Sequence, residues 1–184
     1  MSVSQIAVGF CDWLNKISPR SSEENEVIKY GMELFLDSTV KMIAILCIGI
    51  VLGKGFETVV VLSAFCGLRL QAGGIHAKTG WGCGFSIFLI WAISILGDVF
   101  FDMKVSFLPY IYIASVLIIA YCVPRTMNIK YFSPQDKLRK KLFSIVVLTL
   151  LMAIAFLNPA LRELIVYPVI SEVLTLLPKN KIIT

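Results

Sequence analysis

One histidine and one cysteine in a glycine-rich stretch are the residues of this chain best suited to covalent chemistry. His76 is the only histidine, and Cys83 follows it seven positions later. A thiol is mostly protonated at neutral pH and the thiolate is the nucleophile, so a reactive cysteine needs a base or a positive charge beside it. His76 can take the proton and later return it to a leaving amine, while Arg69 and Lys78 add a positive field. The pair predicts nucleophilic attack by Cys83 on an acyl group, with nearby amide N–H groups as candidate oxyanion donors.

The spacing of His76 and Cys83 restricts the conformation that such catalysis needs. On a continuous α-helix the two positions share a face but lie about 10.5 Å apart along the axis, too far for an imidazole–thiol hydrogen bond. Glycines can interrupt such a helix because they permit positive φ and close backbone approach. Those of the stretch are Gly73, Gly74, Gly80, Gly82 and Gly84. We therefore expect a folded connection that returns Cys83 to His76, rather than a straight helix.

The same residues also have structural interpretations. A lone histidine and a lone cysteine in a membrane loop are more often structural than catalytic. Arg69 can equally contact the substrate or serve a structural role, paired with a lipid phosphate or a helix end. Trp81 is typical of an interfacial aromatic anchor. The cysteines are odd in number and lack CxxC spacing, which argues against a disulfide framework or a zinc cluster; they are Cys11, Cys47, Cys66, Cys83 and Cys122. We expect no metal and no other cofactor.

The composition requires a bilayer as solvent for the elements that carry these residues. Of 184 residues, 58% are hydrophobic and 16% charged, with a mean hydropathy of +0.84, which is more apolar surface than a soluble domain can hide. We predict an all-α, polytopic membrane helix bundle with about six transmembrane segments plus an N-terminal amphipathic helix. The apolar segments are 34–53, 56–72, 84–101, 106–123, 142–158 and 160–177.

The residues before the first span predict helices at the membrane interface. Apolar residues from Ile6 to Ile17 recur at helical spacing, and Ser18-Pro19 ends that pattern. A second start signal at Ser21-Ser22-Glu23-Glu24 leads through 26–35 into the first span. We predict a single domain with interfacial helices at 1–33, the transmembrane bundle at 34–177 and a cytoplasmic tail at 178–184.

Charged residues inside the apolar segments predict helices that face the bundle rather than the lipid. Asp37 and Lys41 lie four residues apart on one helical face and can pair. The last segment contains Pro168 and Glu172. Such residues are costly in contact with lipid, so we expect them to face other helices.

Basic residues between the spans predict the orientation. The 124–141 connection holds six of them, whereas the opposite connections offer little beyond Lys54, Lys104 and Arg162. Basic residues near span ends stay in the cytoplasm, so both termini and residues 73–83 are predicted on that side. A four-span variant with re-entrant second and third segments would keep them there too. The net charge of +5 suits anionic lipid better than nucleic acid, because the basic residues stand between apolar stretches.

At these residues the chain resembles the accessory gene regulator protein B (AgrB) family, membrane peptidases that process quorum-sensing precursors in Gram-positive bacteria. The resemblance rests on Arg69, Gly73-Gly74, His76-Ala77 and Cys83 in the order and spacing of the family's catalytic segment, with support from 26–33. It implies a His76–Cys83 dyad that cleaves an AgrD-like propeptide before its acidic C-terminal tail. The remaining peptide stays on Cys83 as a thioester, and a Cys or Ser of the propeptide then closes a thiolactone or lactone. The resemblance also implies a homodimer in the bacterial cell membrane.

Two interpretations beyond the dyad remain open. A basic run on the 124–141 connection can attract the acidic tail or simply contact lipid headgroups; it comprises Lys137, Arg139, Lys140 and Lys141. The alternative of a different class is a non-enzymatic membrane transporter or assembly component with a polar path and a dispensable His and Cys. That path would be lined by Asp37, Lys41, Arg69 and Glu172.

Overall fold

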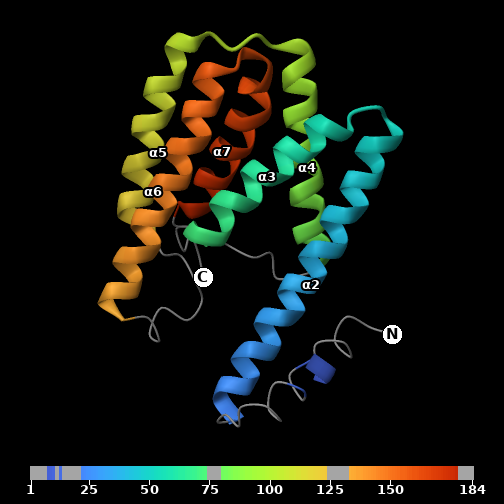
Figure 1. Ribbon diagram of the computed structural model, residues 1–184, viewed down its shortest axis with the longest axis vertical. Helices are drawn as coiled ribbons and strands as arrows, with labels where there is room; N and C mark the ends of the chain where they lie inside the picture. The colour runs from blue at the N-terminus through green and yellow to red at the C-terminus, as the bar shows by residue number, and fades with distance from the viewer. Residues whose placement is uncertain (1–7, 11–12, 14–21, 74–79, 124–132, 178–184) are drawn as a thin grey trace, which may run out of the picture.

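A computed structural model describes residues 8–10, 13, 22–73, 80–123 and 133–177 of the chain, and these residues are built from helices joined by short connections (Figure 1). The α-helices are α2 (Ser22–Val51), α3 (Gly55–Ala72), α4 (Gly80–Phe100), α5 (Leu108–Cys122), α6 (Pro134–Leu157) and α7 (Arg162–Leu176). Two 3-10 turns, η1 (Val105–Phe107) and η3 (Pro159–Leu161), precede α5 and α7. The predicted all-α class is confirmed.

Five helices of the described chain are long and apolar enough to cross a membrane, as the polytopic prediction requires. They are Ile28–Val51, Gly55–Ala72, Gly82–Phe100, Val105–Cys122 and Pro134–Leu157. Because α3 and α4 both qualify, spanning helices are favoured over the re-entrant variant. The sixth predicted segment forms α7, whose 15 residues extend about 22 Å, less than a hydrocarbon core of about 30 Å.

Helix α7 forms the centre of the bundle. It packs against α3, α4, α5 and α6, and most of its residues are buried. Val166 and Val169 of α7 meet Leu68 of α3 and Leu148 of α6 in the main core. Pro168 removes one intrahelical hydrogen bond, which a helix enclosed by protein tolerates better than one exposed to lipid. The prediction that this polar segment faces the bundle is confirmed.

Close helix contacts explain two glycines inside the spans. A Cβ at Gly49 of α2 would lie 2.1 Å from Thr58 Oγ1 of α3, and a Cβ at Gly97 of α4 would lie 2.2 Å from Tyr167 Cε2 of α7. The Thr58 hydroxyl also accepts a hydrogen bond of 2.9 Å from Trp91 Nε1. These contacts tie α2 to α3 and α4 to α7.

Helix α2 is longer than any span needs. It begins at Ser22, as the start signal predicted, and its 30 residues extend about 45 Å. Its C-terminal half packs on α3 and α4, while its N-terminal half projects beyond the other helices (Figure 1). The predicted Asp37–Lys41 ion pair is present. Of the predicted interfacial helix, Val8–Phe10 is helical, and Ser18-Pro19 lies outside the described residues.

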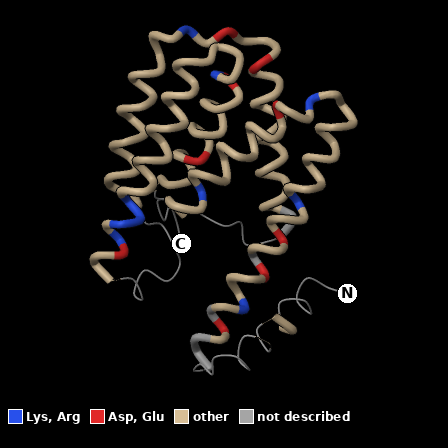
Figure 2. Tube along the Cα trace, in the orientation of Figure 1, with Lys and Arg blue, Asp and Glu red and all other residues tan. Residues whose placement is uncertain are grey.

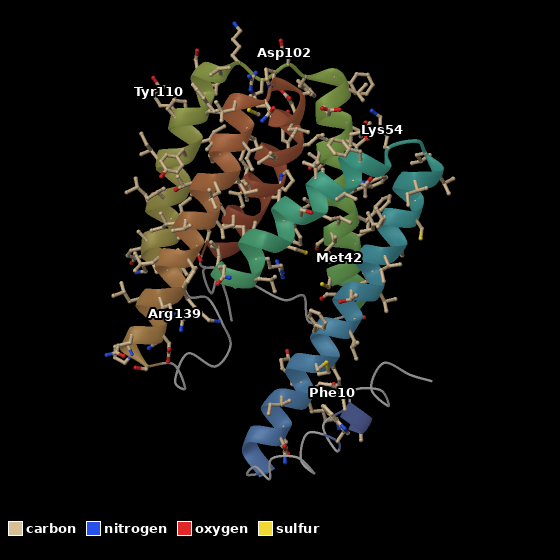
Figure 3. All side chains as sticks on the ribbon, viewed as in Figure 1. Phe10, Met42, Lys54, Asp102, Tyr110 and Arg139 are labelled. Atoms are coloured by element: carbon tan, nitrogen blue, oxygen red, sulfur yellow. The ribbon has the colours of Figure 1, made fainter. Side chains whose placement is uncertain are left out.

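The helices run between two ends of the bundle, which we call the site end and the far end. At the site end α3, α5 and α7 finish and α4 and α6 begin (Figure 1). The far end holds the connections 52–54, 101–107 and 158–161. Lys54 and Asp102 mark the far end and Arg139 the site end (Figure 3). The helix ends that lead into residues 74–79, 124–132 and 178–184 therefore share one end.

Candidate thiol site at one end of the bundle

The site end brings together residues of α3 and α4 that the sequence singled out. Arg69 lies in the last turn of α3, Gly73 directly follows that helix, and Cys83 is the fourth residue of α4. Three other predicted site residues lie outside the described chain: Gly74, His76 and Lys78. The His76–Cys83 pair therefore stays a prediction.

Gly73 ends α3 in a conformation that favours glycine. Its φ is 76° and its ψ −149°, and its N–H donates a hydrogen bond of 2.9 Å to the Arg69 carbonyl oxygen. A side chain at this position would be strained, because residues with a Cβ rarely adopt positive φ. The predicted break of the helix at this glycine is confirmed.

The prediction of a non-helical connection was wrong for Gly80, Gly82 and Gly84. Helix α4 begins at Gly80 and includes all three, and the Ser86 hydroxyl donates to the Gly82 carbonyl at 2.8 Å. In apolar surroundings a backbone gains more from helical hydrogen bonds than glycine loses in conformational entropy. Cys83 consequently lies in the first turn of a helix, where aligned peptide dipoles favour a negative charge such as a thiolate.

Cys83 is half-buried against an apolar cluster contributed by several helices. Buried members of this cluster include Ile45 of α2, Phe65 of α3 and Trp91 of α4. Partial exposure leaves the thiol accessible, whereas a fully buried cysteine is usually inert. The cluster covers one side of the thiol with apolar groups.

A lysine of α2 packs against Gly84, the residue after Cys83, which sequence reasoning did not anticipate. A Cβ added to Gly84 would lie 3.4 Å from Lys41 Cδ, so the lysine stem runs along the backbone of α4. The Lys41 ammonium pairs with the Asp37 carboxylate. The i,i+4 spacing predicted that pair, but its position against α4 depends on how the two helices pack.

Arg69 pairs with a carboxylate on the last helix. Its Nη1 lies 3.0 Å from Glu172 Oε2, and its guanidinium carbon lies 5.3 Å from the centre of the Phe65 ring. Glu172 is fully buried. The sequence suggested for Arg69 a lipid phosphate, a helix end or a substrate; it did not identify a partner 103 positions away. The four charges of the transporter alternative thus form two pairs, Asp37 with Lys41 and Arg69 with Glu172.

The prediction that the basic run lies on a connection was wrong: the run lies on the first turns of α6, at the same end of the bundle. Figure 2 shows its Lys and Arg residues on the first turns of that helix; they are Lys137, Arg139, Lys140 and Lys141. The Arg139 guanidinium carbon lies 5.6 Å from the centre of the Phe143 ring. Cations at a helix N-terminus add to the positive end of the helix dipole, which makes these turns strongly attractive to anions. The run is not brought against α4.

The other described cysteines lie within the helices and are free thiols. Cys66 of α3 donates to Met42 Sδ of α2 at 3.2 Å, and Met42 lies where α2 meets the bundle (Figure 3). Cys122 packs at the edge of the main core, and Cys47 is exposed on α2. Among the described cysteines, Cys83 is the one placed in the first turn of a helix.

Comparisons with known proteins agree with the resemblance. Residues 6–176 match the protein family described as Accessory gene regulator B. The chain is 29% identical over 157 residues to accessory gene regulator protein B of Staphylococcus intermedius, covering 82% of this chain and 81% of that protein. It is 27% identical over 183 residues to protein FsrB of Enterococcus faecalis (strain ATCC 47077 / OG1RF), covering 92% and 74%. The corresponding protein of Staphylococcus haemolyticus (strain JCSC1435) is 23% identical over 157 residues, covering 82% and 81%. No solved structure gives a significant match.

Proposed function

Since the chain belongs to the accessory gene regulator B family, we propose that it is a membrane cysteine endopeptidase that processes a quorum-sensing propeptide. Family membership supports a role in autoinducer processing. The observation that carries the proposal is the half-buried Cys83 thiol in the first turn of α4, close in sequence to His76 and at the end of the bundle where Arg69 and Gly73 lie.

The reaction begins with transfer of the Cys83 proton to the His76 imidazole. The thiolate attacks the carbonyl carbon of the peptide bond before the acidic tail, and the tail leaves as an amine that takes the proton from His76. The rest of the propeptide is then held on Cys83 as a thioester. A thiol within the propeptide attacks this carbonyl, closes a thiolactone and restores the Cys83 thiol; a serine hydroxyl gives a lactone. One thioester replaces another in the thiolactone case, so that step needs no external energy source.

The surroundings of Cys83 support this sequence of steps. The backbone N–H groups of Gly80 and Gly82 lie in the first three positions of α4, where no intrahelical acceptor exists, and are the candidate donors to the oxyanion of the tetrahedral intermediate. The apolar cluster behind the thiol limits access of water, which would otherwise hydrolyse the acyl-enzyme. Cyclisation within the propeptide can then compete with hydrolysis.

Other residues of the site end have supporting roles in the proposal. Lys78 adds a positive field, and Gly73-Gly74 let the segment turn back towards α4. The basic run of α6 attracts the acidic tail of the propeptide; its members are Lys137, Arg139, Lys140 and Lys141. Because the run lies on another helix than Cys83, it acts on the tail rather than on the scissile bond.

We also propose that the site end and both termini face the cytoplasm, and that the chain works as a homodimer in the bacterial cell membrane. The six basic residues of 124–141 support the orientation. In a variant whose other cysteines are Ala, a thiol label that cannot cross membranes should reach Cys83 from the cytoplasmic side only. Labelling from outside intact cells would reverse the orientation.

Co-expression with an AgrD-like propeptide tests the catalytic proposal. Cys83→Ala should abolish release of the tail, and Cys83→Ser should slow it and accumulate an acyl-ester visible by mass spectrometry. Cys47→Ala is the matched control, since that thiol is exposed on α2 away from the site, and it should cleave at the wild-type rate. Full cleavage by Cys83→Ala would show that the thiol is not the nucleophile.

A further inference from the structure

The ion pair between Arg69 and Glu172 joins the last turn of α3 to α7. Arg69 Nη1 lies 3.0 Å from Glu172 Oε2. The Glu172 side chain is fully buried and that of Arg69 retains 19% of its exposure. Glu172 is thus a carboxylate enclosed in the bundle, and its partner, Arg69, lies on the adjacent helix α3.

Stability alone explains this pair poorly. Desolvating two charges costs about as much as their attraction returns, and apolar residues of similar volume often replace a buried pair without loss. Glu172 Oε1 adds to that cost, because it is buried and has no hydrogen-bond partner among the described residues. A pair that contributes little to stability is better explained by the geometry that it imposes.

The geometry connects the pair to Cys83. Arg69 lies four residues before Gly73, whose N–H donates to the Arg69 carbonyl oxygen. The guanidinium also lies over the Phe65 ring, and Phe65 belongs to the cluster against which Cys83 packs. Helix α7 in turn packs along both α3 and α4. Glu172 therefore sets the position of the end of α3 relative to the helix that carries the thiol.

We propose that Glu172 is a positioning residue of the thiol site, which through Arg69 holds the last turn of α3 and Gly73 in register with the first turn of α4. This inference rests on the proposed peptidase function. Arg69 then acts as a link in the scaffold rather than as a contact to the propeptide. Loss of the link misplaces the groups that must meet during attack, and a displacement of about 1 Å can reduce a rate about 100-fold.

The test replaces the pair in two ways in the full-length protein. The double variant Arg69→Met/Glu172→Leu substitutes apolar side chains for both charges. It should keep its unfolding temperature in detergent, lower kcat for tail cleavage about 100-fold and leave KM within about threefold. The variant Glu172→Gln keeps the size and an acceptor for Arg69 but weakens the charge-assisted hydrogen bond, and it should lower kcat about tenfold with KM unchanged.

A second pair provides the matched control. Lys54 and Glu57 are joined at the far end by an ion pair of 2.8 Å, so Lys54→Met/Glu57→Leu removes the same charges away from the site and should keep wild-type kcat. The rate of Cys83 alkylation at neutral pH should change in the Arg69/Glu172 variants and not in this control.

Wild-type kcat in Glu172→Gln would overturn the inference, and that outcome decides the question even if the double variant does not fold. An effect of equal size in the Lys54/Glu57 control would overturn it too, because any ion pair would then matter. The peptidase proposal fails separately: cleavage by Cys83→Ala at the wild-type rate would remove it, whatever Glu172→Gln does.

Discussion

The two ends of the bundle use buried charges in different ways. At the far end, Arg162 Nη1 donates to the Met103 carbonyl oxygen at 2.9 Å and Glu163 Oε1 accepts from the Met103 N–H at 2.8 Å. Both side chains belong to α7, and together they satisfy the backbone N–H and C=O of Met103 in the 101–107 connection. At the site end, the buried carboxylate of Glu172 pairs with the Arg69 guanidinium of another helix.

The two arrangements fix different parts of the fold: one fixes a loop that closes the bundle, and the other fixes the helices that surround the thiol. A side chain that satisfies a loop backbone fixes that loop, because an unpaired buried peptide group is costly. A side chain that pairs with another helix fixes two helices and leaves loop backbone for other partners. The first arrangement suits the end that only has to be closed, and the second suits the end where a thiol must meet a substrate.

Two glycines of α4, one towards each end, provide the largest expected contrast. Gly97→Ala should lower the free energy of unfolding by about 3 kcal/mol, because its Cβ would lie 2.2 Å from the Tyr167 ring and must force α4 away from α7. Gly84→Ala meets only the flexible Lys41 stem, at 3.4 Å, and should be neutral or slightly stabilising. Denaturant unfolding in micelles measures both. Equal losses would mean that α4 is packed alike at its two ends.

The hydrogen bonds that Arg162 and Glu163 form with the Met103 backbone should affect stability without affecting the rate of tail cleavage. Glu163→Leu leaves the half-buried Met103 N–H without its acceptor and should cost about 2 kcal/mol. Glu163→Gln keeps an acceptor of the same reach and should cost less than about 1 kcal/mol. Tail cleavage per folded molecule should match the wild type in both variants. Reduced kcat in folded Glu163→Gln would contradict a purely structural far end.

The basic run of α6 should have a smaller, salt-dependent effect. Replacing all four of its residues by Gln should raise KM for a propeptide with an acidic tail about tenfold at low ionic strength, with kcat unchanged. The change should shrink at high salt, where the charges are screened. Neutralising the far-end residues Lys54 and Lys104 is the control and should leave KM unchanged. If a propeptide with a neutral tail responded equally, the run would be a lipid contact.

The cysteines outside the site should show the smallest effects. Cys47→Ala removes an exposed thiol and should change stability by less than about 0.5 kcal/mol. Cys66→Ala removes a contact of 3.2 Å with Met42 and should cost about 1 kcal/mol. Neither variant should change cleavage. A loss of activity in Cys66→Ala with stability kept would place that thiol in the reaction.

Sequence reasoning succeeded where neighbouring residues decide the outcome. Hydropathy located α3, α5 and α7 within a few residues, whereas α4 begins at Gly80 and α6 at Pro134, before their predicted segments 84–101 and 142–158. The i,i+4 spacing predicted the Asp37–Lys41 pair. The break at Gly73 followed from the conformational freedom of glycine, and the start of α2 from its capping residues. These are local preferences of backbone and side chains, which a short stretch of sequence carries.

Only the tertiary structure decided what those elements meet. It made α7 the core of the bundle, closed the far end on Met103 and brought Glu172 to Arg69 across 103 positions. No periodicity encodes such pairs, because they depend on which helix faces pack together. The sequence by itself therefore determined a membrane helix bundle with a glycine-bounded thiol segment. Packing determined which charged groups hold that segment's helices in place, since a buried charge must find its partner wherever the fold brings one.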